Sequence, residues 1–229
     1  GALPLLNVSE LIALCKDKWG FYQRLAQAGV ACAIESSLDV DLAALVQQFG
    51  LPFLLKPRRG FSSKGIVRVT SEEVFFRHQE DVGATLMAQP IVGNDEEEFT
   101  TSAFCDGRGG YFASMTLRRK LSRDGFTDKA EVADTAEFVP AMDELCSLLR
   151  PLGPTNFQFR RGTTGPKLLE INPRISSATS IRTAFGYNES AMALDYFLDQ
   201  REPTQPAIRR GRAVRYIDEK IFYENRIHL

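Results

Sequence analysis

The stretch of sequence that decides the fold covers residues 153–186 and reads GPTNFQFRRGTTGPKLLEINPRISSATSIRTAFG. Residues 156–161 and 167–172 are short runs rich in apolar residues, and the segment 162–166 between them is made of Gly, Thr and Pro. Two such runs around a turn segment predict a β-hairpin. The residues that follow predict a helix over 176–185, which ends before Gly186 because glycine commonly ends a helix.

Symmetric pairing of this hairpin about its turn places Gln158 opposite Glu170. Because side chains alternate along a strand, Gln158, Glu170 and Asn172 then share one face. The other face carries the apolar side chains that belong in a core, namely Phe157, Phe159, Leu169 and Ile171.

The polar face of the hairpin offers a carboxylate and two amide oxygens. These are hard oxygen ligands of the kind that Mg²⁺ takes, with its remaining positions left to water and phosphate. Arg174 follows beyond Pro173, where its guanidinium can hold a phosphoryl group by two hydrogen bonds. The same residues also suit the solvated face of an exposed hairpin, and spacing alone leaves both interpretations open.

Two further segments carry polar groups next to apolar strands. Lys56 ends an apolar run at 51–56, and the loop 57–65, PRRGFSSKG, combines flexible residues with the cation of Lys64. Such a loop suits phosphates, although it has neither of the common glycine-rich phosphate patterns, and a plain surface turn is the alternative. Residues 88–99, AQPIVGNDEEEF, suit either a solvated acidic loop or a nucleotide hinge.

Composition limits the class of protein. The 229 residues are 44% apolar and 25% charged, and 28 Lys and Arg against 29 Asp and Glu give a net charge of −1. This balance favours neither nucleic acid nor a membrane surface as a partner, and no apolar run is long enough for a membrane helix. The four cysteines show no metal-binding spacing, which favours reduced, buried thiols in a cytoplasmic protein over a disulfide pair.

The rest of the chain predicts an α+β fold of antiparallel hairpins and helices. Helices are expected at 9–28 with a break near Asp17, and at 39–49, 72–79, 137–152 and 188–200. Strands are expected at 66–69, 84–90, 99–106, 110–118 and 213–217, whereas residues 125–134 are expected to be a loop. The opening GALPLLNVSE has no cationic signal region and no Met, so we expect a fragment or a processed chain.

In this order and at these intervals, the segments resemble the ATP-grasp superfamily, with the greatest similarity to the synthetase halves of the carbamoyl phosphate synthase large subunit and short ligases like it. The resemblance covers residues 17–198. It is carried by Asp17-Lys18, by FLLKPRRGFSSKG at 53–65, by 89–91 and 98–106, and above all by 153–186.

The resemblance implies an ATP-grasp domain over 1–229, in which two α+β subdomains with antiparallel sheets clasp the nucleotide. Linker helices would occupy 1–30, a small subdomain with the lid loop 31–90, and a large subdomain with the metal site 91–229. The family's N-terminal domain, which helps to bind the acceptor substrate, is absent from this sequence and is expected elsewhere in the same protein.

Roles for individual residues also follow from the resemblance. The phosphates of ATP would meet Lys18, Lys56, Ser62 and Lys64. The adenine and the ribose would meet Gln89, Pro90, Ile91 and Glu98. Two Mg²⁺ ions, or Mn²⁺ as a substitute, would bind Gln158, Glu170 and Asn172, with Glu170 bridging them. Arg174 would contact the γ-phosphate and the acyl phosphate, and would act in catalysis together with Glu170 and Asn172.

The chain departs from the family pattern at three points. The loop 57–65 holds fewer glycines than usual, and Gln89 stands where the large synthase has Glu. Residues 117–129 do not align, and only Lys129 stands out among them as a weak candidate.

The function implied is that of an ATP- and Mg²⁺-dependent ligase, which activates a carboxylate as an acyl phosphate for attack by an amine. Its partners would be these small-molecule substrates, and a homodimer is common in the family. The alternatives are a catalytically silent ATP-binding regulatory or scaffold module and a plain α+β structural protein. The sequence identifies neither the carboxylate nor the amine.

Overall fold

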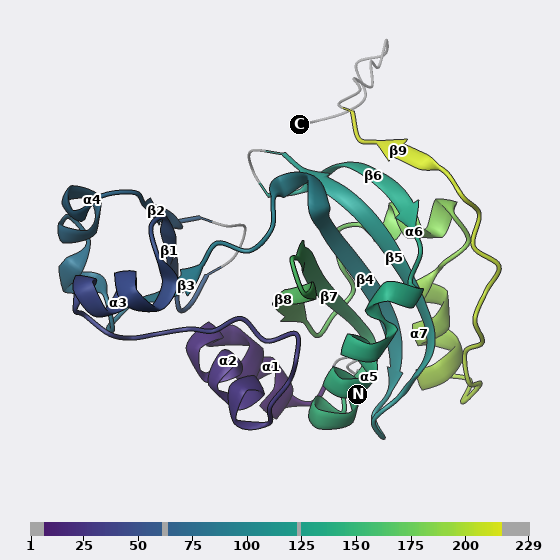
Figure 1. The fold of residues 1–229 in the computed structure, drawn as a ribbon. Helices are drawn as coiled ribbons and strands as arrows, with labels where there is room; N and C mark the ends of the chain where they lie inside the picture. Colours follow the sequence, from purple (N-terminus) through teal and green to yellow (C-terminus); the bar gives the residue numbers. More distant parts are fainter. Residues whose placement is uncertain (1–6, 61–63, 123–124, 217–229) are drawn as a thin grey trace, which may run out of the picture.

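Two separate antiparallel sheets organise the molecule (Figure 1). The computed structural model describes residues 7–60, 64–122 and 125–216. Within these residues, a three-stranded sheet with its helices stands on one side of the molecule and a six-stranded sheet on the other, with α1 and α2 between them on the lower side in Figure 1. This arrangement confirms the predicted α+β class with two subdomains.

The two N-terminal helices are α1 (Ser9–Lys16) and α2 (Lys18–Gln27). They are separated at Asp17, which confirms the predicted break. The side chain of Asp17 accepts hydrogen bonds from the backbone N–H groups of Trp19 and Gly20, so it caps α2. The cap fixes where the second helix begins.

The small subdomain contains α3 (Leu42–Phe49), β1 (Phe53–Pro57), β2 (Val67–Val69), α4 (Glu72–Phe76), a 3₁₀ turn (Gln79–Asp81) and β3 (Leu86–Pro90). The strand order is β2-β1-β3. Its core is formed by Leu45, Phe53, Leu55, Val69, Phe75, Val82, Leu86 and Ala88. Helix α3 begins later than predicted because Asp41 caps it. Helix α4 begins as predicted, after its cap Ser71, but ends at Phe76 rather than at residue 79.

The large subdomain is built on a sheet with the strand order β8-β7-β4-β5-β6-β9. Its strands are β4 (Glu98–Asp106), β5 (Tyr111–Leu121), β6 (Thr127–Ala133), β7 (Leu152–Gly162), β8 (Gly165–Asn172) and β9 (Arg212–Val214). Its helices are α5 (Val139–Leu149), α6 (Thr179–Ala184) and α7 (Glu189–Phe197), with short 3₁₀ turns at Asp95–Glu97 and Ala136–Phe138.

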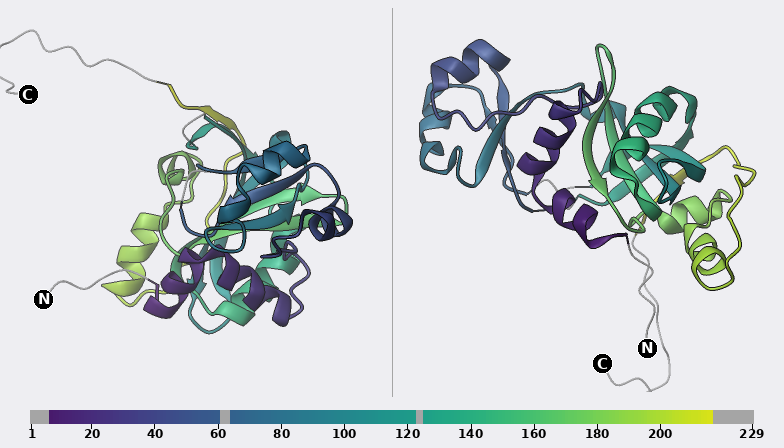
Figure 2. Two further views of the ribbon diagram at one scale, coloured as in Figure 1. Left: turned by 90° about the vertical axis from the view of Figure 1, so that its left-hand side faces the viewer. Right: turned by 90° about the horizontal axis from the view of Figure 1, so that it is seen from below.

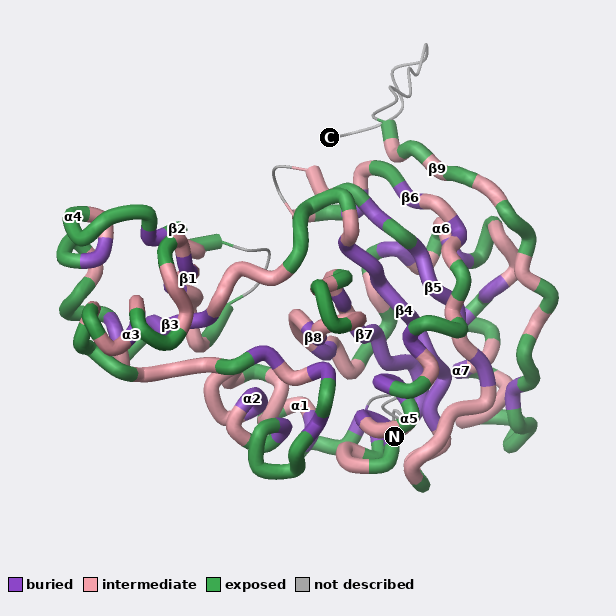
Figure 3. Tube along the Cα trace, viewed as in Figure 1, coloured by how far each residue is buried: buried purple, intermediate pink, exposed green. Residues whose placement is uncertain are grey.

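Helices cover both faces of the large sheet. One face packs against α2 and α5 through a core that includes Phe21, Leu25, Leu145, Phe157 and Phe159. The other face packs against the α6 and α7 region through Met115, Leu117, Val132 and Tyr187. Most residues of the central strands β4 and β5 are buried, whereas the outer sides of α3 and α4 are largely exposed (Figure 3). Figure 2 shows the same two sheets from two further directions.

The boundary of the small subdomain differs from the predicted residue 31. Val30, Cys32 and Ile34 are buried in the core of the large sheet, together with residues of α2 and α5. The first backbone bonds to the small sheet come at Ser37, which exchanges two of them with Ala88. The small core therefore begins later than predicted, because the apolar residues after α2 pack against the larger subdomain.

Residues 125–134 were expected to be a loop, and this expectation was wrong. They contain β6, which pairs with β5 on one side and with β9 on the other. The buried residues of β6 are small or β-branched (Thr127, Ala130 and Val132), with charged residues between them and an irregularity in the pairing near Leu121. This interrupted alternation concealed the strand.

The β7–β8 hairpin has the predicted register at its open end. Asn156 pairs with Asn172, Phe157 with Ile171, and Gln158 with Glu170. Beyond Gln158 a bulge shifts the register by one residue, so that Phe159 pairs with Leu168. Leu168 is therefore fully buried in the core, which was not predicted, whereas the predicted Leu169 is only partly buried and packs against the same core.

All four cysteines are free in the structure. Cys32, Cys105 and Cys146 are buried, whereas Cys15 is only half-buried. Cys105 and Cys146, distant in sequence, meet with their sulfur atoms 3.9 Å apart. Among the described residues, no helix is long and apolar enough to cross a membrane.

Candidate functional site

The predicted polar residues of the hairpin lie on a sheet face that continues onto neighbouring strands. Gln158 is opposite Glu170 on β8 and opposite Thr100 on β4. Glu98, at the start of β4, is opposite Arg160 of β7. Cross-strand partners share a face, so two carboxylates and several amide and guanidinium groups meet there.

Lys56 reaches this face from the small subdomain. It is the last residue but one of β1, and its Nζ donates to the carbonyl oxygen of Leu169 at 3.3 Å. The same carbonyl accepts a 2.6 Å bond from the hydroxyl of Tyr22, whose ring centroid is 5.6 Å from Nζ. Leu169 follows the hairpin bulge, which leaves its carbonyl available to both donors.

Burial lowers the pKa of Lys56 to about 8, since the charged ammonium loses solvation. The charge of Glu170 opposes this effect, and the like charge of Lys18 adds to it. The ammonium of Lys56 therefore titrates closer to neutral pH than an exposed lysine does.

Lys18, the first residue of α2, joins the same group. Its Nζ donates to the carbonyl of Gly60 at 2.7 Å, and its backbone N–H donates to the carbonyl of Arg58 at 2.8 Å. Burial lowers the pKa of Lys18, while the charges of Glu170 and Asp17 act in the opposite direction. The two predicted phosphate-binding lysines and the predicted metal carboxylate thus converge from three separate segments.

Arg58, which the sequence did not single out, fastens the loop after β1 to α2. Its guanidinium donates to Asp17 at 3.2 Å and to the carbonyl of Ala84 at 3.3 Å. Burial acts to raise the pKa of Asp17, but the bond from Arg58, the amides of Gly20 and Trp19 and the charge of Arg58 together lower it. The aspartate is therefore held as an anion beside Lys18.

Glu170 and Asn172 form a small set of oxygen donors at the end of β8. Asn172 Nδ2 donates to Glu170 Oε1 at 3.0 Å. Arg174, exposed in the next turn, donates to Asn172 Oδ1 at 3.4 Å and to the carbonyl of Ile175 at 3.0 Å. A carboxylate beside an amide oxygen fits Mg²⁺, and in the described parts of the chain no three His, Cys, Asp or Glu side chains gather as a softer metal would require.

Gln158 and Glu98 are held by arginines. Arg119 donates to Gln158 Oε1 at 2.6 Å and, through Nε and Nη2, to Glu98 Oε1 at 3.1 and 2.9 Å. Arg160 donates to Glu98 Oε2 at 2.8 Å. The side chains of Arg119 and Glu98 are only 8% and 7% exposed. Arg119 lies in the segment that did not align, although its place two residues after the buried Leu117 is a signal that it faces inward.

The other predicted residues are placed as follows. Gln89 is buried near the end of β3, and its Nε2 donates to Ser36 Oγ at 2.8 Å. Pro90 ends β3, and Ile91 follows it. Ser62 lies outside the described residues, and Lys64 is exposed. Lys129 pairs with Lys120, on the face opposite to Arg119, so it does not join the site.

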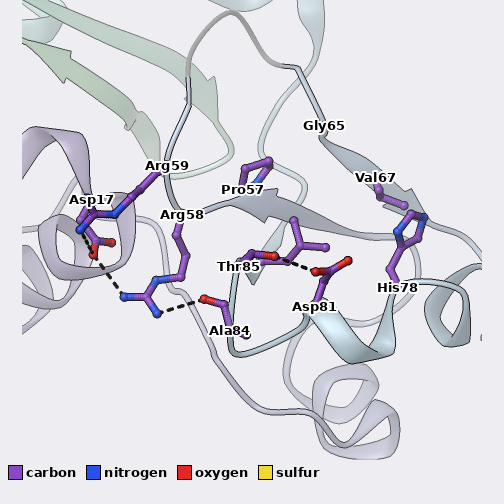
Figure 4. A pocket seen from close by; sticks show the side chains of 11 residues that line it. Asp17, Pro57, Arg58, Arg59, Gly65, Val67, His78, Asp81, Ala84 and Thr85 are labelled. Carbon is purple, nitrogen blue, oxygen red and sulfur yellow. Dashed lines mark hydrogen bonds and ion pairs between the residues drawn. The ribbon is translucent and has the colours of Figure 1, made fainter.

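A pocket of about 740 Å³ lies elsewhere, between the start of α2 and the small subdomain (Figure 4). Arg58, Arg59 and Asp17 lie on one side of it, and Asp81 and Thr85, joined by a 3.0 Å hydrogen bond, lie on another. None of the predicted site residues lines this pocket. We place the functional site at Glu170, because the arginines of the pocket already pair with Asp17.

Similar structures share this fold. N5-carboxyaminoimidazole synthetase from Staphylococcus aureus, solved with ADP, superposes with a TM-score of 0.72 at 16% identity, covering 85% of this chain and 54% of that one. Carboxyaminoimidazole ribonucleotide synthase from Aspergillus clavatus, solved with ATP, gives 0.72 at 17% identity, covering 87% and 56%. The biotin carboxylase domain dimer of the Hydrogenobacter thermophilus 2-oxoglutarate carboxylase, solved with MgADP and bicarbonate, gives 0.71 at 17%, covering 91% and 51%.

The sequence comparisons agree with the fold. An uncharacterized protein of Sinorhizobium fredii, y4rH, is 25% identical over an alignment of 187 positions, and the match covers 73% of this chain and 38% of that protein. The chain thus spans well under two thirds of the relatives that it matches. The family model described as ATP-grasp in the biosynthetic pathway with Ter operon matches residues 85–220, more than half of the chain. The predicted superfamily is therefore confirmed, and the chain belongs to this ATP-grasp family.

Proposed function

We propose that this chain carries the ATP-binding and catalytic centre of an ATP- and Mg²⁺-dependent ligase, which activates a carboxylate as an acyl phosphate for attack by an amine. The observation that supports it is that Lys18 and Lys56 both lie near Glu170, with Lys56 bonded to the carbonyl of the preceding residue, Leu169. The charge of Glu170 acts to raise the pKa of both lysines. The lysines come from α2 and β1, whereas Glu170 lies on the large sheet. Two cations opposite a metal-type carboxylate suit a nucleotide polyphosphate.

The nucleotide would lie between the two sheets. Gln89, Pro90 and Ile91 would meet the adenine at the end of β3. Glu98 would accept a bond from the ribose, since among the described residues its Oε2 accepts one hydrogen bond, from Arg160, which leaves it a lone pair. Lys18, Lys56 and Lys64, with Ser62, would hold the phosphates.

The reaction requires the protein to position the reactants and to neutralise charge, and it requires no covalent intermediate with the protein. A substrate carboxylate oxygen attacks the γ-phosphorus, the bond to the β–γ bridging oxygen breaks, and ADP leaves. The amine then attacks the acyl carbon, inorganic phosphate leaves, and the amine loses a proton. Mg²⁺, held by Glu170 and Asn172, would neutralise phosphate charge during transfer. Arg174 would hold the transferred phosphoryl group through its guanidinium.

The fold supports this proposal through similar enzymes. A synthetase and a carboxylase domain solved with ADP or MgADP share the architecture. At such low sequence identity the similarity extends only to the fold. The substrates of this chain therefore have to be found by experiment. The dimeric state of the carboxylase domain leads us to propose a second copy of this chain as a partner, which light scattering coupled to gel filtration would test.

The test of the proposal is acyl phosphate formation. The chain is incubated with MgATP, hydroxylamine and a panel of carboxylic acids, and ADP and hydroxamate are measured together. We expect at least one acid to yield both products in equal amounts, because hydroxylamine replaces the amine as nucleophile. Tight MgATP binding without ADP release from any acid would contradict a ligase and favour a silent nucleotide-binding module.

The matched variant for this assay is Glu170→Ala. We expect ADP release to disappear while the unfolding temperature changes little, because the half-buried Glu170 accepts only one hydrogen bond, from Asn172, among the described side chains. Glu73→Ala, an exposed carboxylate paired with Arg77 on α4, is the control and should keep full activity. If the Glu170→Ala variant still releases ADP, the proposal that Glu170 binds the metal ion is wrong.

A further inference from the structure

The side-chain oxygen of Gln158 is already taken by a cation of the protein itself. Arg119 Nη2 lies 2.6 Å from Gln158 Oε1. The same guanidinium is fixed from the other side by Glu98, which accepts from its Nε and Nη2. Arg119 and Glu98 are both nearly inaccessible to solvent, so this contact belongs to the interior of the sheet face rather than to a mobile surface pair.

This contact determines how Gln158 is oriented. A guanidinium carries only hydrogen-bond donors, so the group that faces Arg119 must be the amide oxygen. The oxygen and the nitrogen of a carboxamide point in opposite directions, so the NH₂ group of Gln158 is turned away from Arg119. A divalent cation binds the oxygen of an amide and not its NH₂ group.

The charges around Gln158 also disfavour a metal ion there. Arg119 and Arg160 both pair with Glu98, which leaves two guanidinium groups beside one buried carboxylate. Asn172 Oδ1 also accepts from a guanidinium, but that bond is long, at 3.4 Å, and comes from the exposed Arg174 rather than from a buried arginine. The described structure shows no guanidinium on the carboxylate of Glu170, which accepts only from Asn172. The carboxylate of Glu170 is thus open to a metal ion, whereas the oxygen of Gln158 is held by a buried guanidinium that Glu98 fixes in place.

We propose that this site binds a single divalent ion, at Glu170 and Asn172, and that the guanidinium of Arg119 takes the place of a second ion at Gln158. Gln158 then presents N–H donors, which suit a phosphate oxygen, instead of a metal ligand. This inference rests on the proposed function, since it concerns the same nucleotide site. It differs from the two-ion site that the family resemblance implies.

The test counts ions in the full chain. The probes are Mn²⁺ and the non-hydrolysable nucleotide AMP-PNP, with bound Mn²⁺ counted by electron paramagnetic resonance. We expect one bound Mn²⁺ per chain at saturation. Two ions, or none, would overturn the inference. Nucleotide binding in EDTA is measured in parallel by calorimetry, so that failure of the nucleotide site itself is distinguished from a wrong ion count.

Gln158→Glu is the sharpest variant because it changes one side-chain NH₂ group to oxygen. If Gln158 donates to phosphate, Mn²⁺–AMP-PNP affinity falls by about tenfold or more and the count stays at one. If Gln158 were a ligand, the added negative charge would tighten Mn²⁺ binding, and the inference would fail.

Arg119→Gln tests the other half of the argument. Removing the guanidinium frees the Gln158 oxygen, so we expect a second Mn²⁺ to bind, and a count that stays at one would contradict the role given to Arg119. Arg118→Gln is the matched control, since Arg118 is the adjacent residue, half-exposed and paired with Glu131. It should leave both the count and the affinity unchanged.

Discussion

At the scale of single residues, the lowered pKa of Lys56 allows its proposed contact with phosphate to be tested. Its pKa is lowered to about 8 in the free protein, mainly by burial. If Lys56 contacts the phosphates as we propose, their negative charge favours the ammonium, and its pKa is higher in the nucleotide complex. Between these two values binding takes up a proton, and affinity for MgATP therefore falls as pH rises through about 8, by up to about tenfold per pH unit.

Calorimetry of MgATP binding in buffers of different ionisation enthalpy measures this proton uptake directly. Lys56→Met should bind more weakly and lose the pH dependence, because its side chain cannot be protonated. Lys16→Met, at an exposed position at the end of α1, should retain it. Equal affinity of the native chain on both sides of pH 8 would show that Lys56 does not meet the phosphates.

At the scale of elements, the hydroxyl of Tyr22 joins α2 to the bulge of β8. It donates to the carbonyls of Leu168 and Leu169, at 3.1 and 2.6 Å. Tyr22→Phe keeps the ring but leaves these carbonyls short of a donor, so we expect unfolding free energy to fall by about 1 to 2 kcal/mol. Urea unfolding followed by circular dichroism measures the change.

Tyr216→Phe provides the comparison, because the Tyr216 side chain is exposed and its hydroxyl bonds to none of the described residues. The unfolding free energy of this variant should match that of the native chain. If both variants unfold at the same urea concentration as the native protein, the hydroxyl bridge contributes nothing to the attachment of α2.

At the scale of the whole molecule, the two sheets have distinct clusters of buried residues, although Met87 of β3 packs into the larger one. The eight buried residues around Phe53 and Phe75 form one cluster, and the residues around Phe157 and Leu145 form another, larger one. The bonds from Lys56 to Leu169 and from Lys18 to Gly60 join the two parts. The small subdomain should therefore open independently of the large sheet.

Hydrogen exchange followed by mass spectrometry tests this expectation. Amides of β1 and β3 should exchange faster than those of β4 and β7, which lie inside the six-stranded sheet. Saturating MgAMP-PNP should slow exchange in β1 and β3 more than in β4, since the nucleotide would bridge both parts. Uniform exchange across both sheets would indicate one cooperative unit instead.

The sequence by itself determined features that depend on near neighbours in the chain. Alternation along residues 156–172 was sufficient to place Gln158 opposite Glu170, and Asp17 was recognisable as a helix break and cap. The order of these segments was sufficient to predict the ATP-grasp superfamily, which the family match confirms. Short-range sterics and hydrogen bonding control such features, so they are present in the local sequence.

Only the tertiary structure decided which distant residues meet. The contact of Arg119 with Gln158 joins positions 39 residues apart, and the bond from Lys56 to Leu169 spans 113. The bulge that exposes the Leu169 carbonyl, and the strand β6 that was expected to be a loop, follow from pairing with neighbouring strands. The physical reason is that a buried charge or an irregular strand is stabilised by partners that the packed sheet supplies, and local sequence does not specify them.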